Sequence, residues 1–538
     1  MRTPLLRRLR ESLSIATFAE SRGIPTAEAI GLARSSRRTF LGASGVALAA
    51  TAVGCATEFG RAASPLTLTG SVGIVGAGIA GLACADALTA YGVASSVYEA
   101  GDRTGGRIFS MGGRFSGPVS FGGQVVERGG ELIDTTHTTM RSYATRFRLT
   151  LENYHRAPGE VSYYFDGRHV SEAEIVDEWR AFVPRMQADL RTLGSPTADS
   201  FTPAERTLDW MSLEAYLDTR GAGLLLKQVL IEAYEAEYGS AASQQTALAM
   251  LFFAHADRRN RFQPFGVFSD EKYHVAEGNQ AITEGLAASL LRPVELGTRL
   301  VRVAKLSDGR IELTLAQGRR TIRRVHDAVV LTVPFSVLRG IDLTASLGLP
   351  TWKRHAISAY SYGTNAKMMI AFNGRPWAGY GSNGSSYSDL ANHQATWETN
   401  WTGSSPTQGV LTDFSSAARG ASLDPRLVQR EASSFLADLD RLWPGAAAAA
   451  QRQGGNIVAH LEHWPSNPLS LGSYTNNGLG YFTTIADNEA KPVGNLYFAG
   501  EHTSSFYEWQ GFMEGGALSG LRAAGEVADQ LRAVRRAV

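Results

Sequence analysis

The chain has 538 residues and carries 52 Lys and Arg against 51 Asp and Glu, which gives a formal net charge of +1 at pH 7. This balance excludes a large basic surface for nucleic acid and an acidic tail. Hydrophobic residues make up 44% of the chain and charged residues 19%, a composition typical of a folded globular protein with two or more domains. The chain has two cysteines, Cys55 and Cys84, too few for a disulfide framework or a cysteine-based metal site.

Residues 1–64 are typical of an export signal. Arg37 and Arg38, followed by Thr-Phe-Leu, resemble the twin-arginine signal of bacteria. The apolar run 42–56 has no polar face, which argues against an amphipathic first helix of the fold, and it is too short to span a membrane. The sequence therefore predicts export through the twin-arginine machinery to the periplasm or the cell exterior.

The end of this segment is less well defined. Val53-Gly54-Cys55 resembles a lipobox, but Ala52 stands where Leu is usual, so a lipid anchor at Cys55 stays open. We expect the mature chain to begin between Cys55 and Ser64.

A strand, a glycine turn and a helix open the predicted mature chain. Ser71–Val75 has the pattern of a buried strand, and a helix begins at about Leu82. Between them, Gly76 permits a tight turn, Gly78 lets the backbone approach a diphosphate, and Gly81 lets the helix pack on the strand. This order predicts a dinucleotide-binding βαβ unit.

Further motifs extend this unit. The next predicted strand, Ser95–Tyr98, ends at Glu99, where a carboxylate can accept the hydroxyls of an adenosine ribose. Two more glycine pairs follow, Gly105-Gly106 and Gly129-Gly130. Close backbone approach at so many points exceeds what a nicotinamide cofactor requires, and favours FAD.

With these motifs, the chain resembles the flavin-dependent amine oxidases, a family that includes monoamine oxidases, polyamine oxidases and L-amino acid oxidases. The resemblance continues near the C-terminus in Asn495–Thr503 and Trp509–Gly515, the second of which leads into a helix. Gly101 departs from the pattern, because the family often has an Arg there that contacts the adenosine.

The resemblance implies a set of FAD contacts and a non-covalent cofactor. Ser473 stands where monoamine oxidases attach the flavin through a Cys, which excludes covalent attachment at this position. The implied FAD-binding residues are Gly76, Gly78, Ala80, Gly81, Glu99, Gly106, Arg107, Gly129, Gly130, Glu131, Leu132, Leu300, Gly500, Glu501, Phe512 and Met513.

The resemblance also implies an α/β fold in which a discontinuous Rossmann-like FAD-binding domain joins an α+β substrate-binding domain. Helical periodicity at Ile175–Leu190, Leu224–Tyr238 and Thr246–Ala256 predicts a helical insertion on the substrate side. We assign the FAD-binding domain to residues 65–155, 268–345 and 455–538, and the substrate-binding domain to 156–267 and 346–454.

Three residues are expected to carry the chemistry. Lys367 aligns with the family's active-site lysine, which holds a water near flavin N5, although an exposed Lys on an edge strand would give the same pattern. Tyr474 and Phe512 match the two aromatic residues that flank the substrate amine. The helix that begins near Phe512 would direct its positive end and the Met513 amide at the flavin.

The expected reaction is hydride transfer from the carbon next to an amine nitrogen to the flavin. The resulting imine hydrolyses to a carbonyl compound and ammonia or a smaller amine. Oxygen is the expected acceptor and yields hydrogen peroxide, while a dehydrogenase that uses a quinone stays open. His137, His393, His460 and His502 show no metal-ligand spacing, so no metal is predicted.

The expected substrate is a primary amine, diamine or polyamine. Leu132 stands where L-amino acid oxidases commonly have an Arg that grips the α-carboxylate. Asp134 matches a tunnel carboxylate of some polyamine oxidases, although a turn or helix cap explains it equally well. With Glu131 it could attract a cationic amine tail, and Trp509 is assigned to substrate binding too.

Two other functions stay open. An L-amino acid oxidase or dehydrogenase, above all one for basic amino acids, would need a carboxylate-binding Arg that the sequence does not identify. A non-catalytic exported flavoprotein would keep FAD without turnover. Relatives are often dimers, so a homodimer is compatible with the resemblance.

Overall fold

The computed structural model describes residues 15–16, 19, 26, 70–254, 270–399, 407–504 and 509–537. The predicted export signal lies outside the described residues, apart from Ile15, Ala16, Ala19 and Thr26. Within the described ranges, every helix is too short or too polar to cross a lipid bilayer.

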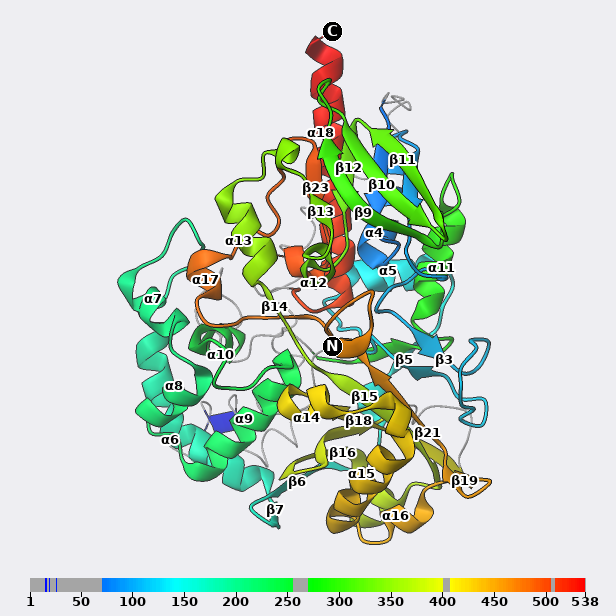
Figure 1. Ribbon diagram of the computed structural model, residues 1–538. Helices are drawn as coiled ribbons and strands as arrows, with labels where there is room; N and C mark the ends of the chain where they lie inside the picture. Colours follow the sequence, from blue (N-terminus) through cyan, green and yellow to red (C-terminus); the bar gives the residue numbers. More distant parts are fainter. Residues whose placement is uncertain are drawn as a thin grey trace.

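A parallel sheet of four short strands forms the centre of the upper half of the molecule in Figure 1. Its strand order is β2-β1-β12-β23, so strands from distant parts of the chain become neighbours. The apolar strand residues are almost all buried, as expected for parallel strands that are covered on both faces. The strands are β1 (Val72–Val75), β2 (Ser95–Tyr98), β12 (Ala328–Leu331) and β23 (Leu496–Phe498).

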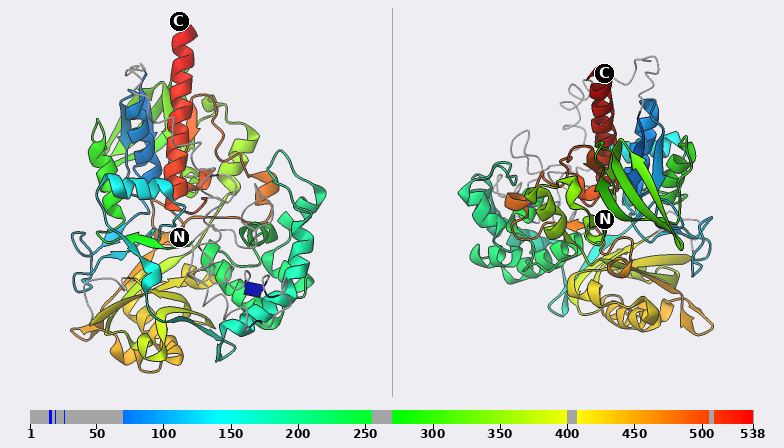
Figure 2. Two further views of the ribbon diagram at one scale, coloured as in Figure 1. Left: turned by 180° about the vertical axis from the view of Figure 1, so that it is seen from behind. Right: turned by 45° about the horizontal axis from the view of Figure 1, so that its top comes forward.

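Helices cover one side of this sheet and a second sheet covers the other (Figures 1 and 2). The helices α4 and α18 pack closely because Gly520 of α18 faces the Ala80 carbonyl, where a Cβ would come within 2.2 Å of the oxygen. The helices of this layer are α4 (Ile79–Ala90), α5 (Thr138–Arg146), α11 (Gln280–Ser289) and α18 (Met513–Ala537). The second sheet, in the order β11-β10-β9-β13, consists of β9 (Thr298–Lys305), β10 (Ile311–Gln317), β11 (Arg320–His326) and β13 (Asp342–Leu343).

A seven-stranded sheet, in the order β21-β15-β18-β17-β16-β6-β7, builds the lower half of the view in Figure 1. The helix α15 (Val428–Leu442) lies against it with α16 (Ala446–Ala449). Strand β15 pairs with a neighbour on each side, so a residue in β15 is not on an edge. The strands are β6 (Glu160–Phe165), β7 (Arg168–Val170), β15 (Ala366–Asn373), β16 (Ser382–Leu390), β17 (His393–Glu398), β18 (Gln408–Ser415) and β21 (Ala459–His463).

A group of helices stands beside this sheet, at the left of Figure 1. The first of them, α6, begins at a capping box in which Ser171 and Glu174 satisfy each other's backbone N–H groups, and it continues through Pro184. α9 ends at Gly239, which adopts a left-handed conformation with φ of 71°. The helices are α6 (Glu172–Leu190), α7 (Pro203–Asp209), α8 (Leu213–Thr219), α9 (Leu224–Tyr238) and α10 (Ala247–Ala254).

The described chain also contains shorter helices and strands. Strand β14 pairs with β22, so Tyr362 lies opposite Thr475, next to Tyr474. These elements are β3 (Ser110–Met111), β4 (Val126–Glu127), β5 (Leu151–Asn153), β8 (Tyr273–Val275), β14 (Ser361–Tyr362), β19 (Arg452–Gln453), β20 (Asn456–Ile457), β22 (Thr475–Asn476), α12 (Phe335–Leu338), α13 (Thr351–Ala359), α14 (Ala417–Ser422) and α17 (Tyr481–Thr484).

Candidate active site

A cavity of about 930 Å³ is lined by backbone and side chains from all of the motif segments. Its volume is at the upper end of the range for small-molecule and cofactor sites. Among the residues singled out from the sequence, the lining includes Gly76, Gly78, Ala80, Glu99, Gly106, Arg107, Gly129, Gly130, Leu300, Tyr474, Gly500, Glu501, Phe512 and Met513. The residues Gly81, Glu131, Leu132, Asp134, Lys367 and Trp509 lie outside this lining.

In the glycine turn after β1, the space beside Gly78 is open to a ligand, whereas Gly76 and Gly81 have no space for a side chain. A Cβ on Gly81 would lie 1.9 Å from the Gly76 carbonyl oxygen, and Gly76 itself has φ of 105°. Gly78 has no atom within 4 Å of the corresponding position, and it lines the cavity. Because α4 begins there without a side-chain cap or an acidic first turn, its N-terminal N–H groups suit an anionic diphosphate.

Glu99 at the end of β2 is oriented by two backbone amides. The Ala77 N–H donates to Oε2 and the Gly101 N–H to Oε1, each at 2.7 Å. The carboxylate oxygens keep lone pairs for ribose hydroxyls, as the sequence predicts for this residue. At Gly101 a Cβ would come within 3.2 Å of Leu469, a cavity residue that belongs to none of the sequence motifs.

In the motif near the C-terminus, the Glu501 carboxylate accepts hydrogen bonds from three segments of the chain. Arg107 donates to its Oε1 at 2.8 Å, while Thr475 Oγ1 and the Gly511 N–H donate to Oε2 at 2.7 and 2.9 Å. Burial alone would raise the pKa of Glu501, but the Arg107 guanidinium and these hydrogen bonds hold it below its usual value. Arg107 also donates to the Ser473 carbonyl at 2.9 Å.

Lys367 is fully buried in β15, which rules out an exposed lysine on an edge strand. Its Nζ donates to the carbonyls of Glu127 at 2.8 Å and Gly129 at 3.1 Å, and to Oε2 of Glu131 at 2.6 Å. These acceptors engage all three N–H groups of the ammonium, so a water bound by Lys367 requires one bond to be released. Gly129 lines the cavity, whereas Lys367 lies behind it and does not.

Glu131 is as deeply buried as its partner. Its other carboxylate oxygen accepts from Trp397 Nε1 at 3.0 Å. The side-chain amide of Asn279 donates to the carbonyls of Gly130 at 2.9 Å and Glu131 at 2.7 Å. No sequence motif marks Trp397, because a single Trp in a strand has the same pattern as a Trp of the hydrophobic core.

Tyr474 and Phe512 both reach the cavity and are each 6% exposed. Tyr474 is fixed by a hydrogen bond from its hydroxyl to the Glu237 carbonyl at 2.7 Å, and Gly511 packs beside its ring. The Phe512 ring has edge contacts with Trp509 and His137, with centroids 6.3 and 5.0 Å apart. His137 therefore supports the aromatic wall, a contact that sequence spacing does not reveal.

Asp134 is buried beside this wall, in the turn before α5. One carboxylate oxygen accepts from the Glu271 N–H at 2.9 Å, and the other lies 3.4 Å from His137 Nε2. The start of α5 is capped from α18, because Glu514 accepts from the N–H groups of Thr139 and Met140 at 2.8 Å each. This contact fixes the beginning of α5 against the beginning of α18, where Phe512 and Met513 face the cavity.

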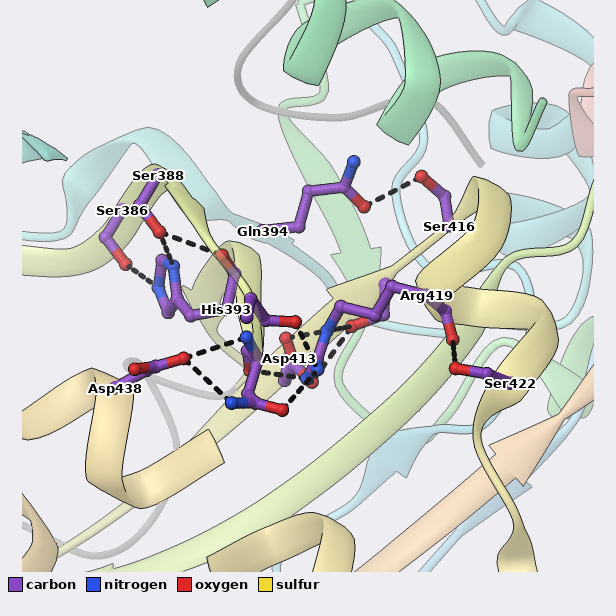
Figure 3. Close-up of polar contacts among 12 residues, drawn as sticks. Ser386, Ser388, His393, Gln394, Asp413, Ser416, Arg419, Ser422 and Asp438 are labelled. Atoms are coloured by element: carbon purple, nitrogen blue, oxygen red, sulfur yellow. Dashed lines mark hydrogen bonds and ion pairs between the residues drawn. The ribbon is translucent and has the colours of Figure 1, made fainter. Parts of the chain in front are cut away.

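A second polar cluster lies within the seven-stranded sheet (Figure 3). His393 Nε2 and Nδ1 contact the hydroxyls of Ser386 at 2.8 Å and Ser388 at 2.7 Å. A serine beside a histidine suggests a nucleophile, but all three side chains are buried, and they lie outside the lining of the large cavity. Burial lowers the pKa of His393 to about 3, so the imidazole stays neutral and supports the strands.

Among the described residues, no group of three or more His, Cys, Asp and Glu side chains is arranged to hold a metal ion.

Comparison with known proteins gives a family match over most of the chain. Residues 79–528 match the family described as flavin containing amine oxidoreductase. Polyamine oxidase 3 of Oryza sativa subsp. japonica is 28% identical over 270 residues, which are 47% of this chain and 48% of that protein, so the match spans about half of each. The flavin-dependent L-tryptophan oxidase RebO of Lentzea aerocolonigenes is 25% identical over 480 residues, 84% of this chain and 97% of that protein.

The fold is similar to that of solved structures. Wild-type putrescine oxidase bound to putrescine has a TM-score of 0.70 and 21% sequence identity, over 86% of this chain and 99% of that chain. At this level of identity the similarity shows a shared fold. It does not show that this chain acts on putrescine.

The contact between Arg107 and Glu501 generates a prediction. We expect Arg107→Ala to lower the free energy of unfolding by about 3 kcal/mol, because the buried Glu501 carboxylate loses its cation. Urea unfolding of FAD-free protein measures this loss. Arg107→Lys, which keeps the charge but not the fork of donors, should lose less. A loss below about 1 kcal/mol for Arg107→Ala, as for a surface pair, would contradict the assigned strength of this contact.

Proposed function

Since the chain belongs to the family of flavin-containing amine oxidoreductases and is an FAD-dependent enzyme, we propose that it oxidises a primary amine, a diamine or a polyamine. The electrons pass to oxygen, and the products are a carbonyl compound, ammonia or a smaller amine, and hydrogen peroxide. FAD, when bound, accepts a hydride from the carbon next to the amine nitrogen.

The chain's own residues fit the parts of FAD in order along the cavity. The N-terminus of α4 at Gly78 would hold the diphosphate, and Glu99 would accept the hydroxyls of the adenosine ribose. Arg107 and Glu501 hold the segments around Ser473 and Gly511 in place at the other end. The start of α18 would present its backbone N–H groups and positive end to the ring that gains negative charge.

The substrate side is built to exclude water and orient a nitrogen. Tyr474 and Phe512 offer aromatic surfaces to the cavity, and such surfaces favour a neutral amine because they cannot solvate an ammonium fully. The fixed hydroxyl of Tyr474 keeps the ring in one orientation. These contacts would place the amine against the flavin without any side-chain nucleophile.

The state of the cations on this side carries the proposal for an amine. Lys367 holds Glu131 at 2.6 Å, Arg375 holds Glu398 at 2.5 Å, and Arg419 holds Asp413 at 3.3 Å. An α-carboxylate would need an arginine to grip it, and neither of these arginines is free to do so. Among the described residues of the sheet and its adjoining loops, the pairing of these cations with carboxylates therefore favours a substrate without a carboxylate.

The substrate class is tested by peroxide release from the FAD-loaded protein. Monoamines, diamines and polyamines are compared with L-amino acids. The panel includes matched pairs, such as cadaverine and L-lysine, whose two members differ by the α-carboxylate. We expect activity on the amines and at least ~100-fold lower kcat/KM on the amino acids, because a buried unpaired carboxylate costs several kcal/mol. Higher kcat/KM on the amino acids would favour an L-amino acid oxidase, as in the relative RebO.

A second prediction concerns Lys367. Lys367→Met removes the donor shared by the Glu127 and Gly129 carbonyls, so we expect anaerobic flavin reduction by the preferred amine to slow about 100-fold while FAD stays bound. Stopped-flow absorbance measures the rate. Lys353→Met is a matched control, because Lys353 is also fully buried and bonded to two carbonyls, but these belong to Asn488 and Glu489, which do not line the cavity. Equal rates in wild type and Lys367→Met would exclude the role of Lys367.

We further propose export through the twin-arginine route, which the pair Arg37-Arg38 ahead of an apolar run supports. Replacing both with Lys should retain the protein in the cytoplasm of a bacterium that has this machinery, as measured by cell fractionation and immunoblotting. The same replacement at the earlier pair Arg7-Arg8 is the matched control and should leave export unchanged. Export of the Arg37→Lys, Arg38→Lys variant would contradict the proposal.

A further inference from the structure

The Lys367 ammonium has a complete set of acceptors within one short segment of the chain. The carbonyls of Glu127 and Gly129 take two of its N–H groups and Glu131 Oε2 takes the third, at 2.6 Å. The contact with Glu131 is the shortest of these bonds, and it is the only one of them that brings an opposite charge. Both side chains are buried, with exposed fractions of 0% and 1%.

The Glu131 carboxylate is held from two strands of the seven-stranded sheet. Lys367 reaches it from β15, and Trp397 Nε1 donates to its other oxygen from β17 at 3.0 Å. The Lys367 Nζ also lies 5.5 Å from the centroid of the Trp397 ring, so these side chains form a closed group. The main chain of Glu131 is fixed as well, by the amide of Asn279.

We propose that Glu131 is a positioning residue and the dedicated counter-ion of Lys367. The proposal rests on the proposed function, which places flavin chemistry at the cavity wall formed by Gly129 and Gly130. Glu131 neutralises the ammonium and fixes it on the Glu127 and Gly129 carbonyls. The wall then faces the flavin in one conformation and without net charge from the pair.

This role differs from the substrate contact expected for Glu131 from the sequence. Each carboxylate oxygen already accepts a hydrogen bond from a buried donor, and Glu131 does not line the cavity. An amine tail in the cavity could reach it only if the wall at Gly129 and Gly130 moved aside, because the side chain is buried. The pair also removes an obstacle, because an unneutralised ammonium behind the wall would repel a cationic substrate.

Other carboxylates around Lys367 are engaged elsewhere. Glu127 bonds through its carboxylate to Ser110 at 2.9 and 3.0 Å and to the Asn279 N–H at 2.8 Å. Glu462 lies directly opposite Lys367 on the neighbouring strand β21, but it pairs with Arg128 at 2.6 Å. Glu462 is therefore a matched control, because it is a buried carboxylate opposite Lys367 in the sheet that pairs with another cation.

The first test is a double-mutant cycle in the FAD-free full chain, with the melting temperature as the readout. We expect Lys367→Met and Glu131→Gln each to lower the melting temperature, because each leaves a buried charge without its partner. The double variant should lose clearly less than the sum of the two, since it contains no unpaired charge. In the control cycle of Lys367→Met with Glu462→Gln, the losses should add.

Additive losses in the Glu131 cycle, or equal coupling in both cycles, would overturn the proposal. If a single variant does not accumulate as folded protein, the double variant should still do so. Failure of the double variant together with both single variants would likewise overturn the pairing.

The second test measures the midpoint potential of the bound flavin by equilibration with reference dyes. Glu131→Gln leaves a positive charge behind the wall and should raise the potential, whereas Lys367→Met leaves a negative charge and should lower it. The double variant should return close to wild type, and a purely structural role would not produce shifts of opposite sign. Neither test uses an amine, so a silent substrate panel with intact coupling would reject the proposed function alone.

Discussion

A buried ammonium must find acceptors, and this requirement ties the two halves of the molecule together at Lys367. The side chain leaves β15 of the seven-stranded sheet and ends on residues 127–131, at the end of β4 and directly after it. An uncompensated charge at this depth would cost several kcal/mol, so the segment 127–131 must stay where its carbonyls and the Glu131 carboxylate reach the Nζ. The wall at Gly129 and Gly130 is consequently set by a strand far away in the sequence.

The buried Glu501 carboxylate likewise needs hydrogen-bond donors, and it holds another part of the cavity wall together. The carboxylate collects donors from Arg107, Thr475 and Gly511, residues from three separate parts of the chain. Each segment contributes a wall residue or its neighbour, so losing the contact would loosen several walls at once. Two buried carboxylates, Glu131 and Glu501, thus fix chain segments that carry wall residues of the cavity.

The glycine turn was readable from the sequence because its constraint is local. Gly76 needs a positive φ, Gly81 has no space for a Cβ, and Gly78 must leave the helix N-terminus open, so the spacing of these residues reports the backbone directly. The predicted strand Ser71–Val75 corresponds to β1 at Val72–Val75 for a similar reason, since a short apolar run is buried on both faces. The helices predicted around Ile175–Leu190 and Leu224–Tyr238 correspond to α6 and α9, whose periodicity is local as well.

The local sequence does not predict which partners the buried charged side chains have. Glu131 and Asp134 share a short motif that suggested amine binding, yet in the folded chain Glu131 meets Lys367 and Trp397, and Asp134 meets Glu271 and His137.

By itself, the sequence determined the βαβ turn, the helical patterns and, through its motifs, the resemblance to flavin-dependent amine oxidases, because these depend on residues close together in the chain. Only the tertiary structure decided which charge neutralises which and which side chains reach the cavity. Those pairings join strands separated by hundreds of residues, and a short sequence pattern carries no information on distances that the whole fold sets.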